Sequence, residues 1–333
     1  MSASPAIARA PTPVRRRAVL VGLLAGPVIA GTACSPERGD QRVGPTGSDE
    51  PLPVPPPTLA PDMPVLIATL ARTRELVRAS TAASGPDADA TVAASATAFG
   101  TQEQVLTQMV QAAGDDADES ASTQEPTPDR DVEAITDLVV EYSLDDSISR
   151  ELLTVSRVNL PTLMSLHGQR IAAARLLGAP VTLPALRGPQ GPGAITMLAA
   201  LRQAVYGLEV LAARSVQDER EGYREALSAL RGPTRLIAAL AGAAAPAPPL
   251  GYGLPGALGT GRQRRSLARD LLQALPEAIM AGSSARATDD DAIAGTITMM
   301  ALSVAQGERF GVPMAGFPGL TVPESAESAD RNG

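Results

Sequence analysis

Residues 163–174 read LMSLHGQRIAAA, and residues 301–312 read ALSVAQGERFGV. The pattern Leu-x4-Gly-x-Arg begins at Leu163 in the first stretch and returns at Leu302, an offset of 139 residues. Neither stretch has the strict alternation of a half-buried strand, so both favour helix. A pattern that returns at a long offset indicates a duplicated structural unit. The alternative is chance similarity in a chain rich in Ala, Leu and Arg.

The rest of the chain, from residue 63 onward, follows the same helical composition. Upstream of the repeated pattern, residues 74–77 (RELV) precede residues 208–211 (LEVL) by 134 residues. Gly and Pro separate eight predicted helices, with a kink at Pro161 in the fourth. The predicted helices are 64–83, 87–113, 131–142, 146–177, 194–215, 217–243, 262–281 and 289–310. Four helices in each half predict an all-α protein built from two tandem antiparallel four-helix bundles.

The two expected bundles are residues 63–180 and residues 194–312. Within the first, the acidic stretch 115–130 lacks apolar residues to bury, so we expect a surface connection there. After the second bundle, residues 313–333 contain three prolines and no apolar periodicity. We expect these last residues to form a disordered tail.

Residues 1–33 are typical of an export signal. Three arginines at 15–17 precede the apolar run 18–33, which is shorter than the roughly 20 residues of a membrane-spanning helix. The run ends in Ala33-Cys34, which resembles a bacterial lipoprotein processing site and predicts lipidation of Cys34. An ordinary cleavage site beside a stray Cys is the alternative, and the choice between Sec and twin-arginine export stays open.

Residues 34–62 form the expected tether. The sequence PLPVPPP at 51–57 excludes a helix and favours polyproline II, which extends about 3.1 Å per residue. The tether would hold the helical part away from the membrane, with the lipid as the membrane contact. The expected location is the outer face of the cytoplasmic membrane.

Composition excludes several classes of function. The chain contains 28 basic residues, all Arg, and its net charge is −8. Loss of the export signal, which has four Arg and no acid, makes the net charge −12. An acidic chain with 2% aromatic residues and no Trp is unsuited to nucleic acid. Without Lys, neither Schiff-base chemistry nor a phosphate-binding P-loop is possible.

The second half resembles the actinobacterial ferritin-like domain family. The resemblance rests on residues 204–207 (AVYG), 218–230 (DEREGYREALSAL) and 305–310 (AQGERF). It covers about residues 194–312, with 63–180 as a degenerate copy. The resemblance implies an antiparallel helical bundle in an exported or lipid-anchored protein. It implies no defined activity, because the family is largely uncharacterised.

A ferritin-like di-iron centre needs glutamates from two helices and Glu-x-x-His from two others. The chain has no Glu-x-x-His, and Met164 stands three residues before its single histidine, His167. Where members of the resembled family carry an acid–His pair, this chain has Leu201 and Arg202. We therefore expect no metal and no other cofactor. The polar residues that we expect inside the bundles are Glu75, His167, Arg170, Tyr206, Glu209, Glu308 and Arg309.

These observations favour a cell-envelope lipoprotein that binds an unidentified protein or small ligand without catalysis. No catalytic residues are predicted, because one His allows few catalytic triads and no Gly-x-Ser-x-Gly motif exists. A divergent metal-binding or redox enzyme is the alternative, and a passive spacer is a third.

Overall fold

The computed structural model describes residues 61–86, 88–112, 132–144, 147–254, 257–281, 283 and 287–321. These residues contain helices and no strand, which confirms the all-α prediction. The helices are α1 (Met63–Ala83), α2 (Ala90–Ala112), α3 (Val132–Ser143), α4 (Ser147–Leu152), α5 (Leu160–Leu176), α6 (Pro192–Arg214), α7 (Gln217–Ala241), a 3-10 turn (Gly242–Ala244), α8 (Gly261–Met280) and α10 (Asp290–Arg309). The segment predicted to be an export signal, Cys34 and nearly all of the expected tether lie outside the described residues.

The fourth predicted helix, 146–177, divides into α4 and α5. Pro161 lies in the first turn of α5. A backbone N–H at this position would have no partner within the helix, so proline costs no hydrogen bond there. By contrast, Pro233 lies inside α7, which continues through it to Ala241.

Four helices of the first half form one packing group, in which α1 and α5 each pack against both α2 and α3. The side chain of Asp62, just before α1, accepts hydrogen bonds from the Ser156 backbone N–H (2.7 Å) and from Asn159 Nδ2 (2.8 Å). Asn159 immediately precedes α5. The starts of α1 and α5 therefore lie at the same end of the group.

In the second half, α6 and α10 each pack against both α7 and α8. Glu219 and Arg264, in the first turns of α7 and α8, form a two-point ion pair with N–O distances of 3.0 and 2.5 Å. The two helices therefore begin at the same end. The connection between them, residues 242–260, must return along the bundle. Residues 113–131 separate α2 from α3 and form a connection of equal length.

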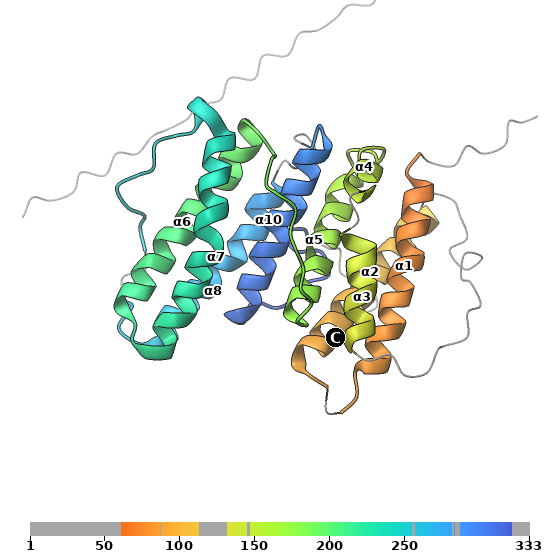
Figure 1. Ribbon diagram of the computed structural model, residues 1–333, viewed down its shortest axis with the longest axis horizontal. Helices are drawn as coiled ribbons and strands as arrows, with labels where there is room; N and C mark the ends of the chain where they lie inside the picture. The colour runs from red at the N-terminus through yellow and green to blue at the C-terminus, as the bar shows by residue number, and fades with distance from the viewer. Residues whose placement is uncertain are drawn as a thin grey trace, which may run out of the picture. The chain divides into compact units, whose positions relative to one another are not determined.

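The two groups meet where α5 packs against α10, and these helices lie side by side in Figure 1. Gly168 on α5 allows this close contact. A Cβ at that position would clash with α10, because it would stand only 2.6 Å from Met300 Cβ. One hydrophobic core runs through both groups and includes Leu70, Leu163, Leu208 and Met300. A smaller cluster surrounds Phe99. The repeated Leu-x4-Gly-x-Arg pattern thus lies at the junction of the two halves.

Residues 313–321, assigned by the proline pattern to a disordered tail, pack against the helices. Phe317 is buried. The carbonyl of Gly316 accepts a hydrogen bond from Gln102 Nε2 (2.9 Å), and that of Pro318 accepts one from Ser165 Oγ (2.8 Å). Prolines remove backbone donors but leave carbonyls, so an extended segment is still held by side-chain donors.

Among the described helices, α6 alone is long and apolar enough to cross a membrane, judged by length and composition only. Its buried residues, such as Leu201, Leu208 and Leu211, belong to the core shared with α7 and α8.

Candidate functional site

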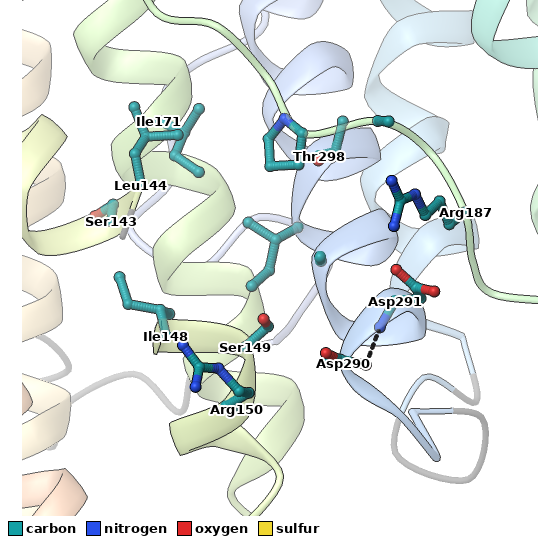
Figure 2. A pocket seen from close by; sticks show the side chains of 14 residues that line it. Ser143, Leu144, Ile148, Ser149, Arg150, Ile171, Arg187, Asp290, Asp291 and Thr298 are labelled. Atoms are coloured by element: carbon teal, nitrogen blue, oxygen red, sulfur yellow. Dashed lines mark hydrogen bonds between the residues drawn. The ribbon is translucent and has the colours of Figure 1, made fainter. Parts of the chain in front are cut away.

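A pocket of about 430 Å³ lies at the junction of the two halves (Figure 2). We call it the junction pocket. Its walls come from the end of α3, from α4, α5 and α10, and from the extended connection before α6. The residues that line it are Ser143, Leu144, Ile148, Ser149, Arg150, Ile171, Pro184, Ala185, Arg187, Asp290, Asp291, Ala294, Ile297 and Thr298.

Local sequence positions each wall. Prolines keep the connection before α6 extended, since they cannot continue a helix. The start of α10 is set by Asp289, whose side chain accepts a hydrogen bond from the Ala292 N–H at 2.7 Å. This cap holds Asp290 and Asp291 in the first turn of α10, beside the pocket.

The junction pocket has an apolar floor and a charged rim. Ile148, Ile171 and Ile297 line the pocket and are buried, and we call them its floor. Figure 2 shows Arg187 and Asp291 on one side of the pocket and Arg150 on another. No ion pair joins any of these three side chains to a partner among the described residues. The rim therefore offers charges of both signs to a ligand.

A second polar site lies inside the first helical group, around Arg170. The Arg170 guanidinium is fully buried. Its Nε donates to Gln102 Oε1 at 3.0 Å, and its Nη2 donates to Thr73 Oγ1. Gln102 Nε2 also donates to Gln169 Oε1 at 2.7 Å. We call these four residues the interior polar cluster; they join α1, α2 and α5 without a carboxylate.

Burial controls the ionisation of Arg170 and of His167 one turn before it. Desolvation, followed by the nearby charge of Arg72, lowers the pKa of Arg170 to about 9. Arg170 remains a cation at neutral pH. Desolvation, followed by the charge of Arg170, lowers the pKa of His167 to about 3. The imidazole is therefore neutral at physiological pH.

Several buried polar atoms in and near the interior polar cluster have no hydrogen-bond partner among the described residues. They are Arg170 Nη1, Gln169 Nε2 and His167 Nδ1. Gln306 Oε1, on α10, is likewise buried without such a partner. Gln306 is the counterpart of His167 in the repeated pattern. Unpaired buried polar atoms cost folding free energy, so these atoms offset part of the stability that the cluster's hydrogen bonds contribute.

The structure separates the polar residues that we expected inside the bundles. His167 and Arg170 are buried together on α5. Glu75 is half-buried and accepts a hydrogen bond from the Tyr142 hydroxyl. The other expected residues belong to the second half, away from the interior polar cluster. Glu209 and Arg309 are exposed, and each forms an ion pair, Glu209 with Arg231 at 2.7 Å and Arg309 with Glu225 at 3.2 Å. Glu308 is half-buried. Tyr206 is also half-buried, and its ring contacts the ring of Tyr252.

The two arginines of the Leu-x4-Gly-x-Arg pattern thus have different surroundings. Arg170 points into the first group, whereas Arg309 forms a surface ion pair. Among the described residues, no group of three or more His, Cys, Asp or Glu side chains is arranged to hold a metal ion.

The junction pocket was absent from the sequence prediction. Two weak signals mark it: Arg187 stands alone in a Pro- and Gly-rich segment, and Asp290 and Asp291 open a helix. Each has an ordinary structural explanation, and only packing of the two halves brings them together. No family model, curated protein or solved structure matches the chain.

Proposed function

We propose that this protein is an exported, lipid-anchored envelope protein whose two ferritin-like four-helix units form a non-catalytic binding module. The repeated helix packing supports the fold part of the proposal. In each half the first helix packs on the second and third, and the last helix packs on the same two. A long connection between the second and third helices accompanies this order, as in ferritin-like bundles with one crossover.

The observation that argues against a metal centre in the first helical group, and so carries the non-catalytic role there, is the position of Arg170. A ferritin-like metal centre places carboxylates from several helices inside the bundle, where they neutralise two cations. Here a fully buried guanidinium contacts Thr73 and Gln102 from two neighbouring helices. A fixed cation at this depth repels a second cation strongly, because little solvent screens it.

The anchoring part of the proposal depends on the sequence before the helices. Cys34 follows the apolar run 18–33 directly, and it is the only Cys in the chain. A net charge of −12 after removal of the signal gives no basic attraction to anionic lipid. Two acyl chains are enough for stable membrane attachment without a spanning helix.

Metal analysis of the full chain, purified without chelator, tests the binding role against the metal-enzyme alternative. We expect iron and manganese well below one equivalent per chain. Stoichiometric metal that remains after dialysis would overturn the proposal. The Arg170→Gln variant serves as a comparison, since removal of the cation should not create a metal site when the carboxylates are missing.

Growth with labelled fatty acid tests the anchor. The wild-type protein should carry label and partition with membranes, whereas the Cys34→Ser variant should do neither. Ser35→Ala is the matched control, because it alters the neighbouring position and keeps the thiol. A Cys34→Ser protein that is still labelled would refute lipidation at this residue.

A further inference from the structure

The junction pocket has the size and lining of a small-molecule site. Its volume of about 430 Å³ falls within the roughly 300–1,000 Å³ range of ligand pockets. Ile148, Ile171 and Ile297 provide apolar contact from three different helices. Because the walls come from both halves, the site exists only when α5 and α10 are packed together, and such interfaces are preferred places for ligand sites.

The rim charges are balanced and unpaired among the described residues. Asp290 Oδ1 accepts a hydrogen bond from the Asp291 N–H at 3.0 Å, so part of its charge serves the start of α10. Within the described part of the chain, no ion pair involves Asp291, Arg150 or Arg187. Figure 2 shows the Arg187 and Asp291 side chains extending toward one another beside the cavity.

Buried hydroxyl groups give the junction pocket further hydrogen-bonding capacity. Thr298 is 3% exposed and lies on the α10 wall; Ser143 is 5% exposed and lies on the α3 wall. Ser143 Oγ has no hydrogen-bond partner among the described residues. A pocket filled only by apolar ligand would leave both polar groups unused, which favours a ligand with its own donors or acceptors.

We infer that the junction pocket binds a small zwitterion with an apolar body, such as a free apolar α-amino acid or a short apolar peptide. Its carboxylate pairs with Arg187, its ammonium pairs with the neighbouring Asp291, and its apolar side chain contacts Ile148, Ile171 and Ile297. A simple anion would be repelled by Asp290 and Asp291. A simple cation would be repelled by the two arginines. This inference rests on the proposed binding role, and it is independent of the lipid anchor.

Calorimetric titration of the full chain in detergent tests the ligand class with four probes. Leucine and leucyl-leucine carry both charges, N-acetyl-leucine carries only the carboxylate, and leucinamide carries only the ammonium. We expect at least one zwitterion to bind and each blocked analogue to bind about tenfold or more weakly, the equivalent of one lost charged contact. The inference is overturned if neither leucine nor leucyl-leucine binds at concentrations up to about 10 mM, which already corresponds to very weak affinity. Equal binding of N-acetyl-leucine also overturns it, in favour of an amphipathic anion.

Variants then locate the binding. Arg187→Gln and Asp291→Asn should each weaken the binding of the zwitterion by about tenfold. Arg231→Gln and Asp218→Asn are matched surface controls and should leave affinity unchanged. Circular dichroism and thermal unfolding of every variant separate lost binding from lost folding. Binding that survives both rim variants refutes this pocket as the site. Metal content, measured on the same preparation, reports failure of the proposed function separately.

Discussion

The carbonyl oxygen of Gly188 lies so close to Gly295 on α10 that a Cβ at position 295 would stand 1.9 Å from it. The contact is mutual, because a Cβ on Gly188 would stand 2.7 Å from the backbone of Ala292. Glycine at both positions lets the extended connection lie directly on the helix. Arg187 is next in the chain, so this contact also positions one wall of the junction pocket.

Gly295→Ala should therefore destabilise the protein. The new methyl group meets backbone rather than a flexible side chain, and overpacking of this kind costs about 1–3 kcal/mol or more. The urea unfolding midpoint measures the effect. Gly100→Ala is the control, because a Cβ at that position would have no atom within 4 Å apart from the neighbouring backbone of its own helix. In a helix interior, that change should stabilise by up to about 1 kcal/mol. Equal midpoints for the two variants would contradict the close contact.

His167 should make stability depend on pH below neutrality. Its pKa is about 3 in the folded protein and 6.5 as an ordinary value, so the unfolded chain binds the proton first. The stability that depends on neutral His167 is therefore fully present above pH 6.5, and it is lost progressively as the pH falls toward 3. The loss is on the order of 5 kcal/mol at most.

The His167→Gln variant should remove this pH-dependent loss of stability, because glutamine does not titrate. Glutamine is a suitable replacement, since it occupies the equivalent position, 306, in the repeated pattern. Chemical unfolding of both proteins between pH 7 and 4 provides the measurement. Carboxylates titrate alike in both proteins, so the difference isolates the single histidine. Parallel stability curves would mean that His167 is not desolvated in the folded state.

Gln102→Leu should be strongly destabilising. The Gln102 side chain donates to Gln169 and to the Gly316 carbonyl, and it accepts from Arg170. Its loss leaves three buried groups without a partner, each costing about 1–3 kcal/mol. Gln111→Leu, exposed on the same helix, is the control and should change stability little. Faster proteolysis near residue 316 in Gln102→Leu would report release of the C-terminal segment.

The Glu219–Arg264 ion pair should show clear coupling in a double-mutant cycle. Its two hydrogen bonds are partly shielded, and Arg264 lowers the pKa of Glu219 mainly through them. The more exposed pair Arg224–Glu221, 3.7 Å apart on α7, should show weaker coupling that salt abolishes more readily. Unfolding free energies of Glu219→Gln, Arg264→Gln and the double variant test this expectation. Equal coupling in the two pairs would contradict it.

The helices were predictable because their information is local. Gly178 and Pro180 end α5, and the Asp residues at 289–291 begin α10, through backbone effects that act within one turn. The all-α class follows from this local signal. The prediction was less accurate for residues 313–321, since their order depends on donors from α2 and α5 that lie far away in the sequence.

The site was less predictable for the same reason. Arg170 and Arg309 occupy equivalent places in the repeated pattern, yet one is buried beside Gln102 and the other pairs with Glu225 on the surface. Nothing within the two short motifs distinguishes them. The difference arises from which neighbouring helix covers each arginine, and that is a property of packing.

By itself, the sequence determined the helices, their order, the repeated Gly and Arg positions, and the single Cys after an apolar run. Helix formation depends on neighbouring residues, so a linear pattern suffices. Only the tertiary structure decided that α5 and α10 join the two halves, that Arg170 is buried without a carboxylate, and that Arg150, Arg187 and Asp291 surround one pocket. These relations depend on close packing between residues far apart in the chain, which local propensity does not encode.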